Sequence, residues 1–253
     1  MLGRARDGDL TRAAAANQTA WLARTSEAAG GIVHRERGLT WMASPAGAVL
    51  AFPRASRARV VELLPRLLDA ARKERAFEAS CWSQLPTTPR DLDEILGAAG
   101  FRGGWQAQWM AVAIDEPGIP EPPTGVVVGL VEGPWAVTGL PWDGSGIARV
   151  RERLAHARPR RVWHVGAWRD GQPVGHALLN VTAGKLGVAG VYDMGVAPAE
   201  RRRGIGRALT VALLALARSA GCEVATLNAT TEGELLYRQL GFRPVGVAQT
   251  WWR

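Results

Sequence analysis

The sequence predicts an α/β protein of two tandem domains, each a mixed, mostly antiparallel β-sheet flanked by helices. A segment with four prolines, IDEPGIPEPPTG from Ile114 to Gly125, breaks any regular element and separates two halves. In the second half, strand patterns come first and then alternate with helical patterns, as in a mixed sheet covered by helices. We therefore expect a first domain at 1–115, a linker at 116–125 and a second domain at 126–253.

The two halves repeat the same order of elements. The second half reads VAPAERRRGIGRALTVALLALARSAG and then CEVATLNATTEGELLYRQLGFRPVGVAQTWWR, and the first reads LAFPRASRARVVELLPRLLDAARKERA and then AFEASCWSQLPTTPRDLDEILGAAGFRGGWQAQWMAV. Each shows a strand, a proline turn, a long helix, a strand, a glycine-stopped helix and Gly-Phe-Arg before a closing strand, which favours duplication. Where the second half has Gly204 and Gly206 the first has no glycine, and Leu96 stands in place of Tyr237. The first half is therefore predicted to be a degenerate copy that lacks the glycine loop.

Periodicity and turn residues predict the elements of the second half in order. The expected strands are Val126–Trp135, Arg161–Trp168, Pro173–Thr182, Leu186–Val196, Glu223–Leu227 and Val245–Trp252, and the expected helices are Gly146–Ala157, Ile205–Ala220 and Glu232–Leu240. The turn RDGQ joins the second strand to the third, and Gly221 ends the second helix.

The composition excludes several classes of protein. An apolar fraction of 47% suits a globular domain with a core, and no apolar run approaches the roughly 18 residues of a membrane span, so no membrane partner is expected. The start, MLGRARDGDLTRAAAANQ, lacks the apolar segment of a secretory signal. Two cysteines without metal-ligand spacing argue against disulfides and a metal site. We expect a cytoplasmic protein.

The positive charge comes almost entirely from arginine. The net charge is +8, yet Lys73 and Lys185 are the only lysines, and most arginines are scattered along the chain. Such a bias is typical of GC-rich coding, so nucleic acid is disfavoured as a partner.

The segment RRRGIG, before a long apolar helix, is the strongest functional signal. The first amides of a helix have no intrahelical partner, and together with the helix dipole they favour an anion. Glycine at 204 and 206 lets a phosphate approach the backbone, and arginines at 201, 202, 203 and 207 supply fork-shaped donors. The pattern predicts a diphosphate-binding loop; a solvated basic turn is the alternative.

In its context this loop resembles the GCN5-related N-acetyltransferase (GNAT) family. Arg-x-x-Gly-x-Gly after a strand, with LYRQLGF some thirty residues later, carries the resemblance, which is good over Arg161 to Arg253 and weaker over Val126 to Pro159. The whole chain resembles tandem members of the family. The resemblance implies an acetyl-CoA-dependent N-acetyltransferase that acts by direct attack of a primary amine, on a small molecule or peptide, without a metal. A non-catalytic acyl-CoA-binding regulatory module is the alternative, and whether the chain forms a homodimer is left open.

The resemblance also implies a set of cofactor-binding residues. The backbone of residues 194–196 would pair with the pantetheine arm, for which Gly195 leaves space, and the amides of residues 202–207 would cradle the pyrophosphate. Asn228 stands two residues before Thr230, the position at which an asparagine is common in the family. The cofactor-binding residues are then Met194, Gly195, Val196, Arg201, Arg202, Arg203, Gly204, Ile205, Gly206, Arg207 and Asn228.

Two residues are candidates for proton transfer. Tyr237 matches the family's tyrosine beside the thioester sulfur, and a phenol with a pKa of about 10 stays protonated at neutral pH beside a departing thiolate. Asp193, in the otherwise apolar GVYDMGV, is the candidate base for the amine. The alternatives are an ordinary core tyrosine and a carboxylate paired with an arginine. The chain departs from many family members at Gly190, where they carry a glutamate.

Other polar and aromatic residues are weaker candidates for catalysis or acceptor binding. His164 and His176 lie on predicted strands and are interpreted as core residues. Trp168, Trp251 and Trp252 give a hypothesis for the lining of an acceptor pocket.

Overall fold

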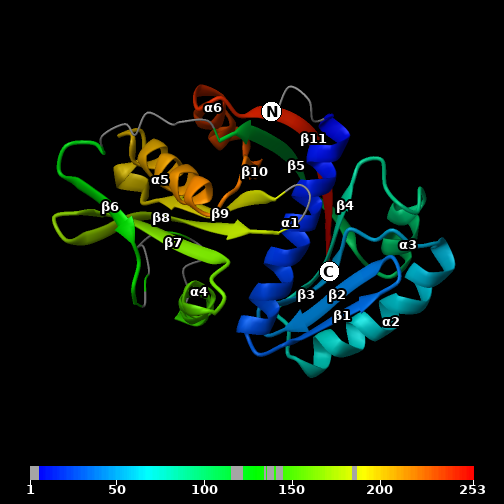
Figure 1. The fold of residues 1–253 in the computed structure, drawn as a ribbon. Helices are drawn as coiled ribbons and strands as arrows, with labels where there is room; N and C mark the ends of the chain where they lie inside the picture. Colours follow the sequence, from blue (N-terminus) through cyan, green and yellow to red (C-terminus); the bar gives the residue numbers. More distant parts are fainter. Residues whose placement is uncertain (1–5, 115–121, 134, 136–139, 141–144, 184–186) are drawn as a thin grey trace. The chain divides into compact units, whose positions relative to one another are not determined.

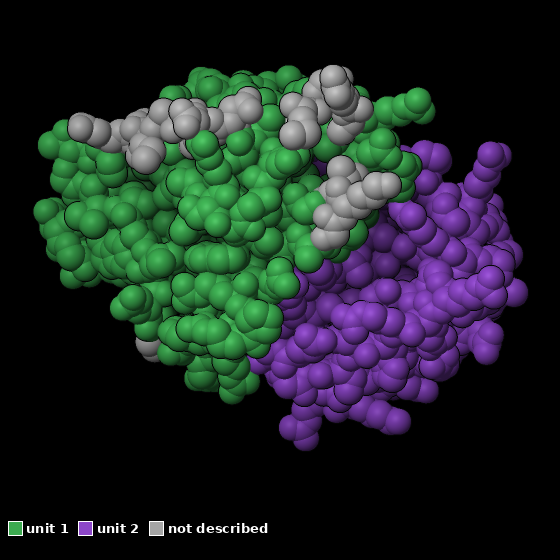
Figure 2. All heavy atoms as spheres, in the orientation of Figure 1, with its two compact units in different colours: residues 1–17, 110–244 green, residues 18–109, 245–253 purple. Residues whose placement is uncertain are grey.

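The structure is a computed structural model that describes residues 6–114, 122–133, 135, 140, 145–183 and 187–253. The first part of the expected linker, residues 116–121, lies outside the described residues. The chain forms two compact units: unit 1 comprises residues 1–17 and 110–244, and unit 2 comprises residues 18–109 and 245–253 (Figure 2).

Unit 1 is a sheet with helices, formed mainly by the second half of the sequence (Figure 1). Its elements are β6 (Val126–Leu130), α4 (Ser145–His156), β7 (Val162–Arg169), β8 (Gln172–Val181), β9 (Val188–Val196), α5 (Ile205–Ser219), β10 (Val224–Ala229) and α6 (Thr231–Gln239), with the start of α1 (Asp7–Ala28) and the end of β5 (Arg102–Ala113). The strand order is β5–β10–β9–β8–β7–β6. Strands β6 to β9 pair antiparallel, and β9 pairs with β10 in parallel.

Unit 2 repeats this arrangement with the first half of the sequence. Its elements are the rest of α1, β1 (Ile32–Glu36), β2 (Leu39–Ser44), β3 (Gly47–Ala51), α2 (Arg57–Lys73), β4 (Ala79–Gln84), α3 (Leu92–Ala98), most of β5 and the main part of β11 (Arg243–Trp252). The pair β3 and β4 is parallel, as is the pair β9 and β10. The series β3-α2-β4-α3-β5 therefore matches β9-α5-β10-α6-β11, the order that the sequence repeat predicts.

The compact units differ from the domains expected at 1–115 and 126–253 in two respects: residues 1–17 belong to unit 1, and the two closing strands are divided between the units. In unit 2, β11 pairs with β4, from Ala248 opposite Gln84 to Trp252 opposite Ser80. In unit 1, the chain leaving β5 lies beside β10, where the Ile114 N–H donates to the Glu223 carbonyl oxygen at 2.9 Å. Unit 2 thus contains most of β11, the closing strand of the second half of the sequence, and unit 1 contains the end of β5, the closing strand of the first half.

The elements predicted for the second half agree with the structure to within two residues at most ends. The first strand is the main exception, because it ends at Leu130 and not at Trp135; Glu132 and Gly133, which follow, are residues depleted in strands. Leu186, the predicted start of the central strand, lies outside the described residues.

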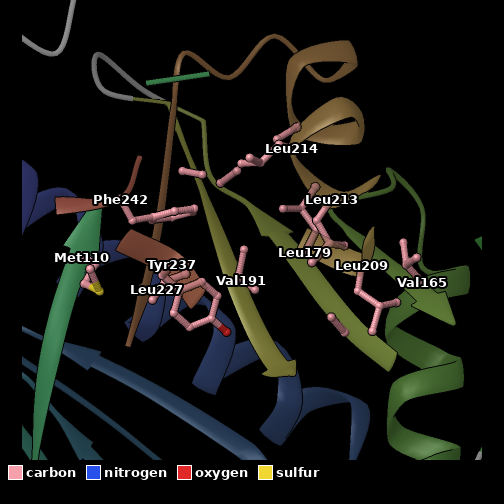
Figure 3. Packing of buried hydrophobic residues seen from close by; sticks show 14 of the residues in the cluster. Met110, Val165, Leu179, Val191, Leu209, Leu213, Leu214, Leu227, Tyr237 and Phe242 are labelled. Carbon is pink, nitrogen blue, oxygen red and sulfur yellow. The ribbon is translucent and has the colours of Figure 1, made fainter. Parts of the chain in front are cut away.

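The core of unit 1 lies between α5, α6 and one face of the sheet. The expected apolar stripe of α5 is confirmed, since Ile205, Leu209 and Leu213 are buried (Figure 3). On β8, Ala177 and Leu179 belong to this core. Residues 176, 178 and 180 alternate with them and therefore point to the opposite face of the sheet.

Candidate functional site

The two parallel strands at the centre of unit 1 separate and form a fork. Strand β9 pairs with β10 from Val188 opposite Val224 to Val191 opposite Leu227. It then runs on to Val196 with β8 as its only ladder partner among the described residues. Residues 194–196 of β9 consequently present a backbone edge that has no second ladder partner among the described residues, and this edge faces the space beyond Leu227, which we call the fork.

A β-bulge in β9 lies at the opening of this fork. His176 pairs with Gly195 and Leu178 pairs with Tyr192, so two residues of β9, Asp193 and Met194, stand opposite one residue of β8. Asp193 has a positive φ of 47°. Because a bulge bends the strand that carries it, the bend falls where β9 leaves β10.

The loop between β9 and α5 has the backbone geometry of a nest, a concavity lined by N–H groups. It passes through a 3₁₀ turn, Pro198–Glu200, and two left-handed residues, Arg202 at φ 62° and Gly204 at φ 81°. Within the described chain, the N–H groups of residues 202–207 have no acceptor; the next, of Ala208, donates to the Gly204 oxygen at 3.1 Å. Left-handed residues before a helix aim successive N–H groups into one concavity, which binds anions.

The two loop glycines also have local structural reasons. The positive φ of Gly204 strains any other residue, and a Cβ there would lie 3.2 Å from Pro123 Cγ. A Cβ on Gly206 would lie 3.1 Å from Leu236 Cδ2 in α6. Gly206 therefore serves the packing of α5 against α6 as well as access to the loop amides.

The four arginines of the loop are exposed and differ in their partners. Arg201 Nε donates to the Val196 oxygen at 3.2 Å, and Arg203 lies 3.4 Å from Glu200 Oε2. Arg202 and Arg207 make neither an ion pair nor a hydrogen bond to the residues that the structure describes. These two are the cations that could turn toward an anion in the nest without breaking a contact.

Tyr237 lies at the closed end of the fork. It packs in the core cluster that contains Val191 and Leu227, the last pair of the β9–β10 ladder (Figure 3). Its ring contacts Phe242 edge to face at 5.6 Å between centroids, and its hydroxyl points away from Phe242. Burial raises the pKa of Tyr237 to about 12, so the phenol is protonated at neutral pH.

Asp193 is paired with an arginine, which is the alternative that the sequence left open. Arg151 Nε, on α4, donates to Asp193 Oδ2 at 3.1 Å. The Arg151 side chain is 2% exposed and the Asp193 side chain 30% exposed. A guanidinium this deeply buried requires an anion beside it, so Asp193 has a structural role whatever else it does. The role of Asp193 as a base stays a prediction.

The other predicted cofactor residues line the fork, with one difference. A Cβ on Gly195 would lie 2.5 Å from Leu140 Cδ1, so Leu140 fills the space that the sequence led us to expect above Gly195. Met194 and Val196 are half-buried at the open edge of β9, and Asn228 is half-buried beyond the last pair of β10.

Sequence reasoning placed the two histidines in the core, and this is confirmed. His164 Nε2 and His176 Nδ1 are 3.0 Å apart, and both side chains are buried. The hypothesis for Trp251 was wrong, because it packs in the core of unit 2. Arg151 was missed, since the spacing of 42 residues to Asp193 leaves no local signal in the sequence.

The described residues show neither a candidate metal site nor a candidate membrane-spanning helix. They contain no group of three histidine, cysteine, aspartate or glutamate side chains that could hold a metal ion. None of their helices combines the length and the hydropathy that crossing a membrane takes.

Residues 130–242 match the sequence model of the acetyltransferase (GNAT) family. No curated protein matches the chain. Among solved structures, a GCN5-related N-acetyltransferase from Kribbella flavida is similar at 21% identity over 94% of this chain and 95% of that one, with a TM-score of 0.67. A tandem GNAT protein from the clavulanic acid biosynthesis pathway, solved without AcCoA, is similar at 17% identity over 85% of this chain and 78% of that one, with a TM-score of 0.58. These likenesses confirm the predicted fold class, a mixed sheet flanked by helices.

Proposed function

We propose that this chain, with its GNAT family domain at residues 130–242, is an acetyl-CoA-dependent N-acetyltransferase that acts on a primary amine of a small molecule or peptide. One observation carries the proposal: the nest before α5 lies at the end of the same strand, β9, that presents an open edge to the fork. A ligand with a diphosphate at one end and an extended, amide-containing arm suits both features.

The nest would hold the diphosphate. The amides of residues 202–207 supply donors with no other acceptor in the described chain, and Arg202 and Arg207 supply charge. The amides of the pantetheine arm would pair with the edge of residues 194–196, as an added strand does. Leu140 does not obstruct this pairing, because a Cβ stands out of the plane of the sheet and an added strand lies within it.

The thioester would then lie at the closed end of the fork, near Val191. The amine nitrogen attacks the carbonyl carbon, a C–N bond forms, the C–S bond breaks, and the amine loses a proton while the sulfur departs as a thiolate. Tyr237 is protonated at neutral pH and donates a hydrogen bond to the sulfur as its charge develops. Full proton transfer is uphill, because a thiol has a pKa of about 8.5. Stabilisation of the leaving sulfur is therefore the role that suits Tyr237.

Asp193 is the proposed acceptor of the amine proton, directly or through water. It lies two residues beyond Val191, on the part of β9 that borders the fork. Arg151 fixes the orientation of its carboxylate through Oδ2.

The test is release of the coenzyme A thiol from acetyl-CoA with amines, polyamines, aminoglycosides and peptide amino termini, alongside calorimetric titration of acetyl-CoA. We expect binding, and thiol release that depends on an amine. Binding without turnover on any amine would favour an acyl-CoA-binding module, and the absence of binding would refute the proposal.

A further inference from the structure

A buried polar network joins the N-terminal helix to the sheet of unit 1. Asn17, in the part of α1 that belongs to unit 1, is 0% exposed. Its Nδ2 donates to the carbonyl oxygens of Asn180 at 3.0 Å and Val188 at 2.9 Å. Its Oδ1 accepts from Asn180 Nδ2 at 3.1 Å and from the Tyr192 hydroxyl at 2.7 Å. A buried amide bonded on both sides has one defined position and orientation.

The partners fix which way the Asn17 amide faces. The carbonyl oxygens of Asn180 and Val188 only accept, so they require the NH₂ group. The amide oxygen must then face the hydroxyl of Tyr192. An aspartate of the same size would bring an oxygen against the two carbonyls.

Asn17 and Tyr192 fill the space above Gly190. A Cβ on Gly190 would lie 2.1 Å from Asn17 Oδ1 and 2.5 Å from Tyr192 Cε2. Both distances are shorter than Cβ contacts allow, so a side chain at residue 190 would displace Asn17 and Tyr192 from these positions. The ring of Tyr192 therefore lies back along β9, over Gly190, with its hydroxyl on Asn17.

This network lies at the closed end of the fork. Tyr192 is the first residue of β9 beyond its last pair with β10, and it alternates with Val191, which faces the core and Tyr237. The two tyrosines of the chain thus lie at the same point of the sheet, on opposite faces. The core fills the Tyr237 face, so an amine must approach from the Tyr192 face, where Tyr192 and Asp193 are only half-buried.

We propose that Asn17 is a positioning residue that holds Tyr192 over Gly190, and that the held ring closes one end of the acceptor site and limits the length of the amine. This inference rests on the proposed N-acetyltransferase function. It makes a residue of the first helix part of the acceptor site of unit 1.

The experiment compares acetylation of n-butylamine and n-octylamine by the full chain. We expect Tyr192→Ala to raise the octylamine-to-butylamine ratio of kcat/KM about tenfold. Asn17→Ala should raise the same ratio by a smaller factor, because the ring remains but is no longer held. Tyr192→Phe removes the same hydrogen bond without leaving a cavity, so it should reproduce Asn17→Ala, and the double variant should add nothing further. The affinity for acetyl-CoA should be unchanged in all of them.

The outcomes distinguish the limit on amine length from the positioning role of Asn17. An unchanged ratio in a Tyr192→Ala protein that still acetylates n-butylamine would overturn the limit on length. A ratio that changes in Tyr192→Ala but not in Tyr192→Phe would overturn the role of Asn17, even if Asn17→Ala failed to fold. Failure of the wild-type chain to acetylate either amine, despite activity on peptide amino termini, would overturn this inference and leave the proposed function standing. Failure on every amine would remove both.

Discussion

The segment after β9 and its counterpart after β3 differ although their surroundings have the same topology. Strand β3 pairs with β4 to its last residue, Ala51 opposite Trp82, and the next amide, of Phe52, donates to the Trp82 oxygen at 2.7 Å. Strand β9 leaves β10 at Val191 and runs on to Val196. In unit 2 the two parallel strands therefore stay paired to the end of β3, whereas in unit 1 they separate before the end of β9.

The arginines at the starts of α2 and α5 also differ, because those of α2 have partners in the fold. Arg57, at the start of α2, pairs with Asp91, and Arg59 donates to the carbonyl oxygen of Arg37. Arg202, before α5, and Arg207, in its first turn, make no such contacts within the described part of the chain. The comparison teaches that the two units share one scaffold, and that among the described residues unit 1 leaves a backbone edge and two cations unused by the fold where unit 2 does not. On this basis we propose that the first half of the sequence is the degenerate copy.

Gly206→Asp should have the largest effect on acetyl-CoA affinity, and no such effect is expected at the equivalent segment of unit 2. A carboxylate among the loop amides repels a diphosphate, and the added Cβ lies 3.1 Å from Leu236 Cδ2. Affinity for acetyl-CoA, measured by calorimetry, should fall by about a hundredfold or more. The matched control is Ala58→Asp, at an exposed position in the first turn of α2, which should leave the affinity unchanged. Equal effects of the two variants would contradict the comparison.

Tyr237→Phe should have the next largest effect. It removes the proposed hydrogen bond to the departing sulfur and keeps the ring that packs on Phe242. We expect kcat to fall about tenfold to a hundredfold with little change in acetyl-CoA affinity. A variant that works at full speed would exclude Tyr237 from the chemistry.

The raised pKa of Tyr237 also predicts a change in stability with pH. The folded chain holds this proton up to a pKa of about 12, against about 10 when unfolded. This raised pKa contributes about 3 kcal/mol to the free energy of unfolding. The contribution is complete below pH 10 and is lost as the pH rises toward 12. Between pH 9 and pH 11.5, the free energy of unfolding measured by denaturant titration should fall more for the wild type than for Tyr237→Phe. Parallel curves would contradict the assignment.

The smallest effects belong to the exposed arginines. Arg202→Ala and Arg207→Ala should each weaken acetyl-CoA binding about two- to fivefold, and the difference should shrink at high salt because exposed charges are screened. Arg57→Ala, in the equivalent region of unit 2, should change nothing. A salt-independent effect would indicate that the arginines act through the fold of the loop.

Much of the fold could be predicted because its signals are local. The stripe of α5 and the glycine at its start are both patterns within one element. The closing strands could not be assigned, because the pattern of β11 shows that it is a strand but not that β4 is its partner.

The candidate site divides in the same way. The free amides of the loop before α5 could be predicted from six consecutive letters, RRRGIG, because they are backbone groups of one segment; that they bind a diphosphate stays a prediction. The partner of Asp193 and the residue that fills the space above Gly190 could not be predicted from the sequence. Arg151 comes from α4, and Asn17 comes from α1, 163 residues before its partner Asn180. A glycine in place of an expected glutamate was a signal that another part of the chain fills its space.

The most direct test of the central claim is a crystal structure of the full chain with coenzyme A. The account predicts the diphosphate on the amides of residues 202–207 and the pantetheine arm along residues 194–196 of β9. A diphosphate bound before α2, or an arm that leaves the edge of β9 unpaired, would contradict it.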